Sequence, residues 1–306
     1  MTQSFVMRLF LLLFVAVAYS SCKCQGGQQD GNSDKDAIEA VSLDEKMLDD
    51  FNKSKLIFYT LPSPLETAML IKRSGAVYDE DLLNPVTSVN QYQTNLKMAL
   101  NLGIYSADLS YASLFDQTQT TIQYIGVAKK LADGLGILQA IDENTIKKLE
   151  ANMNNREVVL DLISESFMNS NAFLTENNRP AIAVTVLVGG WIEGLYFATG
   201  LTNGSLENNK NLVERIIYQK LSLETVINLL EDQEPNEDTD YLLGKMQELK
   251  VIFDQVKIVT TSNVEAVTNA DERTTIIRAD SETFMSKEVF GKLIEKVKEI
   301  RTEFVS

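Results

Sequence analysis

Apolar residues return every three or four positions along most of this chain, a spacing that places their side chains on one face of an α-helix. Stripes of this kind predict helices within residues 122–135, 158–167, 212–217, 242–256 and 289–300. The first stripe consists of Ile122, Ile125, Ala128, Leu131, Ala132 and Leu135. The predicted helices begin at irregular intervals, so the pattern indicates a single bundle without a fixed-period repeat.

Capping residues place two more helices ahead of these stripes. Ser63 followed by Pro64 is typical of a helix N-terminus, and Gly75 predicts where that helix ends. Ser88 predicts another helix start, because a serine side chain can accept a hydrogen bond from the free N–H groups of a first turn. Gly103 is expected to end this second helix.

One stretch near the C-terminus departs from the helical spacing. Between residues 257 and 279, β-branched residues recur at short range around the turn-like Asn269-Ala270-Asp271. This pattern predicts a β-hairpin, and a final amphipathic helix is expected from about Ser286. The sequence therefore predicts an all-α fold, a compact multi-helix bundle with one small β-hairpin near 257–279.

Residues 179–201 form the most hydrophobic segment that follows the N-terminal leader, and Glu193 is the only charged residue between its two ends. The segment is long enough to span a bilayer. It equally fits the central helix of a soluble bundle, which is apolar on every side because neighbouring helices surround it. We expect the second arrangement, since an unpaired acid at mid-bilayer costs several kcal/mol.

Two acids on apolar helical faces are the candidate site residues. Asp108 and Glu193 each precede a tyrosine by three positions, Tyr111 and Tyr196, so acid and tyrosine share a helix face. Burial should raise the pKa of such acids unless they are paired. The plainest interpretation is that each acid bonds a tyrosine hydroxyl or a buried backbone donor. The alternatives are a ligand-binding site made of these four residues and a catalytic pair of carboxylates.

The first residues have the features of a secretory leader. Arg8 precedes an apolar run over residues 9–18, which is too short to span a bilayer. The small residues Ser20 and Ser21 stand directly before Cys22, as signal peptidases require. The sequence thus predicts a signal peptide over residues 1–21 and a mature chain that begins with a lipidated Cys22.

Several segments carry a resemblance to known proteins. The sequence SSC at 20–22 resembles the end of the bacterial lipoprotein signal, although Tyr19 stands where that signal usually has an aliphatic residue. LPSPLE, NLGIYSADLSYA and GGWIEGLY resemble segments of uncharacterised helical lipoproteins of Bacteroidota, across most of residues 56–230. The resemblance implies a lipid-anchored protein of the cell envelope and supplies no activity.

The part of the chain after the leader divides into a tether and a domain. Residues 22–36 lack large apolar side chains and predict a flexible tether, and residues 37–306 predict a single helical domain. Lys23 is not the aspartate that retains lipoproteins in the inner membrane of many enterobacteria. By that resemblance we expect the outer membrane, with the protein facing the periplasm.

Composition excludes several classes of function. The chain has no histidine, and both cysteines, Cys22 and Cys24, lie at the export boundary. Ser-His-Asp and Cys-His catalysis are therefore excluded, and the sequence predicts neither a metal site nor a cofactor. The net charge of −15 disfavours binding to nucleic acid, because nucleic acid is itself polyanionic.

These observations favour a non-enzymatic envelope lipoprotein that binds a protein partner or a small molecule and reaches the membrane through its N-terminal lipid. Two other functions are open. One is a histidine-free hydrolase that uses Asp108 and Glu193 on envelope glycans, and the other is a structural or assembly accessory near the membrane. The distance between the two carboxyl groups discriminates, because a paired-acid mechanism fails if they lie more than about 10 Å apart.

Overall fold

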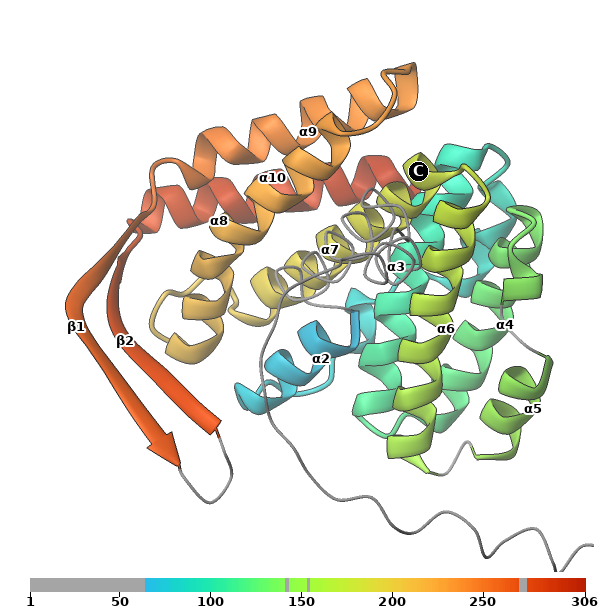
Figure 1. Cartoon of the computed structure of the whole chain (residues 1–306), viewed down its shortest axis with the longest axis horizontal. Coiled ribbons are helices and arrows are strands. Elements are labelled where there is room, and N and C mark those ends of the chain that lie inside the picture. The colour runs from blue at the N-terminus through green and yellow to red at the C-terminus, as the bar shows by residue number, and fades with distance from the viewer. Residues whose placement is uncertain (1–63, 141–142, 153–154, 270–273) are drawn as a thin grey trace, which may run out of the picture. The chain divides into compact units, whose positions relative to one another are not determined.

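The computed structural model describes residues 64–140, 143–152, 155–269 and 274–306. In this part of the chain α-helices pack together, and the strands form a two-stranded antiparallel sheet (Figure 1). The predicted all-α bundle with a small hairpin is confirmed. The leader, Cys22 and the tether lie outside the described residues.

Helices follow one another along most of the described chain. They are α2 (Pro64–Arg73), α3 (Asn95–Leu114), α4 (Thr118–Gly134), α5 (Glu143–Ala151), α6 (Arg156–Glu176), α7 (Pro180–Leu201), α8 (Lys210–Glu231), α9 (Glu237–Phe253) and α10 (Lys287–Val305). The short 3-10 helices η2 (Glu80–Leu82), η3 (Val86–Gln91) and η4 (Leu138–Ala140) lie in the connections. Neither α5 nor these short helices was predicted from the apolar stripes.

Helices α3 and α7 form the centre of the bundle, and both bury most of their residues. Helix α7 contacts α2, α3, α6, α8, α9 and α10 (Figure 1). By length and composition α7 could cross a membrane, yet 78% of its most apolar stretch is buried against the rest of the protein. Packing therefore accounts for the apolar sequence of α7, in agreement with the expected core helix.

The boundaries predicted for the helix around Gly103 are wrong. Ser88 lies in η3, and α3 begins only at Asn95, where the Thr94 side chain accepts a hydrogen bond from the Lys97 N–H at 3.2 Å. The helix then continues through Gly103 to Leu114. By contrast, Gly75 follows α2 in the left-handed conformation, with φ of 83°, as a helix-ending glycine should.

Gly103 is needed because α3 and α7 touch at their backbones. A Cβ atom on Gly103 would lie 1.9 Å from the Val186 carbonyl oxygen of α7. From the other helix, a Cβ on Gly189 would lie 2.0 Å from the Leu100 carbonyl oxygen. Two glycines on facing surfaces thus set the distance between the central helices.

Helix α4 shows a rotated inward face. Ile122, which the sequence pattern placed inward, is 45% exposed, whereas Tyr124 and Val127 are buried. Tyr124 is drawn inward because its hydroxyl donates a hydrogen bond to the Asn84 carbonyl oxygen at 2.8 Å. Of the remaining inward positions, Leu131, Ala132 and Leu135 are buried as expected, whereas Ile125 and Ala128 are half-buried.

The hairpin joins α9 to α10. Strand β1 (Lys257–Asn269) pairs with β2 (Thr274–Phe284) from Lys257 opposite Phe284 to Asn269 opposite Thr274. The second strand ends at Phe284 and not at 279, because residues 281–284 pair with the first residues of β1. The final helix begins where the sequence predicted, with the Ser286 side chain as its N-cap.

Candidate functional site

The structure brings Asp108 of α3 and Glu193 of α7 together. The close helix approach at Gly103 and Gly189 places the two acids one to two turns further along, on facing sides of the helices. Both residues are completely buried, and their carboxyl groups are close enough for each to shift the pKa of the other. The two acids that the sequence singled out therefore form one cluster, which we call the acid pair.

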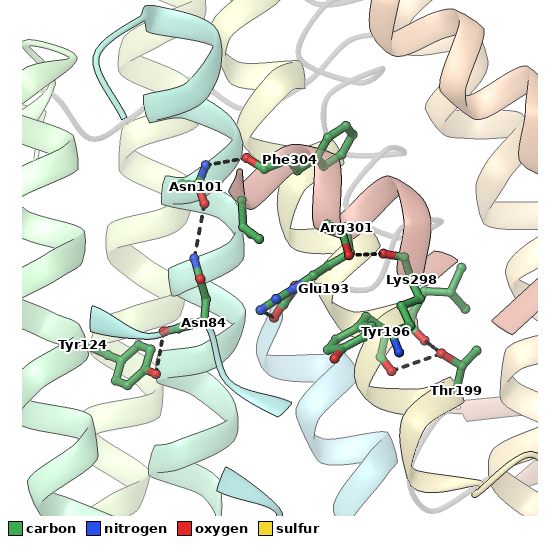
Figure 2. Close-up of polar contacts among 12 residues, drawn as sticks. Asn84, Asn101, Tyr124, Glu193, Tyr196, Thr199, Lys298, Arg301 and Phe304 are labelled. Carbon is green, nitrogen blue, oxygen red and sulfur yellow. Dashed lines mark hydrogen bonds and ion pairs between the residues drawn. The ribbon is translucent and has the colours of Figure 1, made fainter. Parts of the chain in front are cut away.

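Arg301 of α10 neutralises the acid pair. Its Nε donates to Glu193 Oε2 and its Nη2 donates to Glu193 Oε1, both at 3.0 Å. Figure 2 labels the two side chains. The Arg301 side chain is only 12% exposed. A two-pronged arginine–carboxylate contact of this kind is the strongest form of ion pair that side chains make. It ties the last helix to the central one.

Burial favours the neutral form of the acids in the acid pair. Burial raises the pKa of Asp108 well above its usual range, and the adjacent negative charge of Glu193 raises it further. The Arg301 charge and the nearby Asn84 N–H counteract this only in part, and no donor among the described residues meets the Asp108 oxygens in ordinary hydrogen-bond geometry. Burial raises the pKa of Glu193 as well, but the Arg301 charge opposes that rise more directly, so Asp108 is the acid of the pair that favours the neutral form.

The two tyrosines of the predicted site do not bond the acids. Tyr196 is half-buried. The guanidinium carbon of Arg301 lies 4.8 Å from the centre of the Tyr196 ring, which is a cation–π contact. Tyr111 accepts a hydrogen bond from the Asp79 backbone N–H at 2.9 Å, and its ring stacks on Phe197 with centroids 4.7 Å apart. Burial raises the pKa of Tyr111 to about 12. Neither acid therefore makes the expected hydrogen bond to its tyrosine, and Arg301 binds Glu193 instead.

Arg301 is the residue that the sequence interpretation missed. It lies four positions after Val297, on the inward stripe of α10, and its neighbours Ile300 and Phe304 are fully buried. A lone cation on an apolar stripe is the signal that could have identified it, because a buried charge requires a partner.

A second polar network anchors the end of α10 beside the acid pair (Figure 2). Asn101 of α3 donates to the Phe304 carbonyl oxygen at 3.0 Å and accepts from the Asn84 side chain at 3.3 Å. Tyr124 of α4 closes the network by donating to the Asn84 carbonyl oxygen. These contacts satisfy buried polar groups of α3, α4 and α10 and hold the three helices in register.

The geometry of the acid pair opposes glycan hydrolysis. Hydrolytic carboxylates flank the bond that they cleave and stand roughly 5–9.5 Å apart. Here Asp108 and Glu193 are both closed to solvent, each shifts the pKa of the other, and Arg301 holds the Glu193 carboxylate. The cluster can organise helices, but it leaves no room for a sugar between the two acids.

The structure contains a different place for a ligand, a hollow between α3, α4, α5, α6 and α7, which we call the apolar pocket. Its volume is about 100 Å³ and it is partly open to solvent. Apolar side chains provide most of its wall, among them Leu102, Leu109, Ile125, Leu149, Ile163 and Leu174. Polar residues line one part, and Lys129 is the only charged residue of the lining. The sequence analysis did not predict this pocket, because its walls come from five helices.

The fold and the site define the protein as an all-α bundle with a buried acid–arginine cluster and an apolar pocket. Comparison with protein-family models, with curated proteins and with solved structures finds no match to the chain. Within the described ranges, no group of three side chains is arranged to hold a metal ion.

Replacement of Asp108 by asparagine should make the protein more stable at neutral and alkaline pH. The folded-state pKa of Asp108 is raised above its unfolded value, so its contribution to stability is fully present below about pH 4 and is lost as the pH rises. An asparagine amide at this position would keep a donor to Glu193 and cannot ionise. We expect the advantage of Asp108→Asn in unfolding free energy to grow with pH, by up to about 1.4 kcal/mol per unit.

Denaturant unfolding of wild type and Asp108→Asn between pH 4 and pH 8 measures this difference. Parallel stability curves, with the variant below wild type throughout, would show that Asp108 is ionised in the folded protein.

Proposed function

We propose that this protein is a non-enzymatic lipoprotein of the cell envelope that binds a small hydrophobic molecule in the apolar pocket. The pocket is the observation that carries the proposal. A cavity of about 150 Å³ with apolar walls accommodates a benzene molecule, so a pocket of about 100 Å³ is large enough for a short hydrocarbon group.

The acid pair supports a binding role over a catalytic one. Asp108 and Glu193 are the acids whose pKa values burial raises most clearly, and both are committed to packing around Arg301. The apolar pocket contains no carboxylate, and the chain contains no histidine. Recognition in such a pocket depends on apolar contact and shape, which bind a ligand without changing it.

A pocket-filling substitution tests ligand binding. Ala128 lies in the pocket wall, and Ala128→Phe would fill the cavity, whereas Ala172→Phe places the same ring on the exposed side of α6. Hexan-1-ol should bind the wild type and Ala172→Phe, measured by calorimetry on the full chain in non-ionic detergent with protein-free micelles as the blank. Loss of binding in Ala128→Phe alone supports the pocket. Equal binding by all three proteins, or by none, overturns it.

A lipid at Cys22 is proposed as the attachment to the membrane, with the outer membrane and its periplasmic face as the location. The support is the SSC sequence at 20–22 after a short apolar run, followed by a tether without large apolar residues. A tethered protein of this kind would hold its pocket close to molecules that enter or leave the bilayer.

Substitution Cys22→Ser should abolish fatty-acid labelling and leave uncleaved precursor, because the thiol is the group that receives the lipid. Labelling with a radioactive fatty acid, followed by electrophoresis, measures both effects. Cys24→Ser is the matched control and should label normally, since bulky Lys23 precedes Cys24. Labelling that persists in Cys22→Ser would refute the lipoprotein assignment.

A further inference from the structure

The apolar pocket has a single charged residue in its lining, Lys129. Lys129 is exposed at its rim, and among the described residues no ion pair engages this lysine. No acid lines the pocket, although the chain carries 43 acidic residues against 28 basic ones. A lone cation at the opening of an apolar pocket favours a ligand with one negative charge.

Neutral donors accompany the lysine. Ser170 and Asn171 of α6 line the same pocket, and within the described chain no hydrogen bond involves their side chains. Other hydroxyls of the lining are already engaged, since Ser106 donates to the Leu102 carbonyl oxygen and Ser166 donates to the Leu162 carbonyl oxygen. The pocket therefore has free donors at Lys129, Ser170 and Asn171, whereas most of its other lining residues are apolar.

We propose that the apolar pocket binds a short-chain monocarboxylate. The carboxylate lies at Lys129 and accepts hydrogen bonds from Ser170 and Asn171, and the hydrocarbon chain occupies the hollow. Scaling from the cavity of about 150 Å³ that holds benzene, the hollow takes roughly four carbons, and its open side leaves space for a slightly longer chain. This inference rests on the proposed function, because it names the chemical class of the molecule that the pocket binds.

One lysine and two neutral donors suit a single negative charge better than a double one. A carboxylate offers two oxygens, and each can accept more than one hydrogen bond, so the three donor groups are sufficient for it. A phosphate monoester carries close to two charges at neutral pH and would leave one of them without a counter-charge.

Hexanoate and hexan-1-ol test the charge preference, because they share a chain length and differ in the head group. Calorimetric titrations use the full chain in non-ionic detergent at pH 7, with protein-free micelles as the blank. Wild type should bind hexanoate more tightly than hexan-1-ol. Lys129→Met should weaken hexanoate binding about fivefold, the loss expected for a partly exposed ion pair, and leave hexan-1-ol binding unchanged.

Lys130→Met is the matched control. Lys130 is the next residue of α4, it is exposed, and its ammonium group bonds the Asn90 side chain and does not line the pocket. This variant should bind hexanoate as wild type does. An equal loss in both lysine variants would reflect the general surface potential and would overturn the proposed carboxylate site.

The other outcomes separate this inference from the proposed function. If hexan-1-ol binds and Ala128→Phe blocks it, but hexanoate binds no better and is insensitive to Lys129→Met, the pocket is real and the monocarboxylate inference is refuted. If neither probe binds wild type, the proposed function fails together with the inference.

Discussion

Replacement of Gly103 by alanine should destabilise the protein by about 3 kcal/mol, which is the upper part of the range for an overpacked core. The added Cβ would lie 1.9 Å from the Val186 carbonyl oxygen and 2.6 Å from the Gly190 nitrogen. Both atoms belong to the backbone of α7, so no side-chain rotation can relieve the clash. The two central helices would have to separate, and the contacts around the acid pair would loosen with them.

Gly126→Ala is the control for this prediction, because Gly126 also lies within a helix, α4, and a Cβ there would meet no atom within 4 Å. Alanine is the better helix former by about 0.5–1 kcal/mol, so Gly126→Ala should raise the unfolding free energy slightly. Guanidinium unfolding of both variants measures the contrast. A stabilised Gly103→Ala protein would contradict the backbone contact between α3 and α7.

Substitution of Arg301 by methionine should cost about 3–5 kcal/mol, since it leaves the buried acid pair without a cation. Arg301 contacts Glu193 through two hydrogen bonds at 3.0 Å, and its side chain is almost fully enclosed. Methionine keeps much of the packing but none of the charge. For a domain of this size the loss should lower the melting temperature by on the order of 10 °C.

Arg156→Met is the comparison for Arg301→Met. Arg156 also pairs with an acid, Asp116, at 3.0 Å, but both side chains are largely exposed, at 42% and 63%. Exposed pairs contribute at most about 1 kcal/mol, so Arg156→Met should melt close to wild type. If the two arginine variants lose the same stability, the acid pair is not held by Arg301.

Substitutions of Glu193 extend the same prediction. Glu193→Ala should cost nearly as much as Arg301→Met, because Arg301 would lose its partner and a cavity would remain. Glu193→Gln should cost less, since Asp108 can then ionise and take over as the counter-charge of Arg301. The double variant Asp108→Asn, Glu193→Gln removes that alternative and should cost more than the sum of the single changes. Additive effects would show that the two acids act independently.

The amphipathic stripes predicted the helices well, because a periodic apolar face is stable only when it is buried against the rest of the protein. Glu193 was predicted to be buried from its surroundings alone, and the structure places it there. Gly103 was misinterpreted because a glycine within a helix resembles a glycine that ends one. What distinguishes the two is the backbone of α7, which lies more than 80 positions away in the chain.

The partners of the candidate site could not be derived from local sequence. The Tyr111 and Tyr196 spacing favoured contacts within one helix, yet Glu193 is bound by Arg301, 108 positions further along. The apolar pocket could not be derived from local sequence either, since each helix supplies only a few of its wall residues. Such sites depend on how helices are arranged, whereas the sequence pattern specifies only which face of each helix is inward.

The contact between Glu193 and Arg301 also sets an order of events in the making of the protein. A ribosome adds roughly 5–20 residues per second, so the arginine follows the glutamate by roughly 5–20 s over the 108 residues that separate them. During that interval the nascent chain contains Asp108 and Glu193 but not yet Arg301, which supplies their counter-charge. Until then the central helices can bury the two acids only in the neutral form, because a buried charge without a partner is costly. The packing around the acid pair can therefore be completed with its charges balanced only after Arg301 has been synthesised.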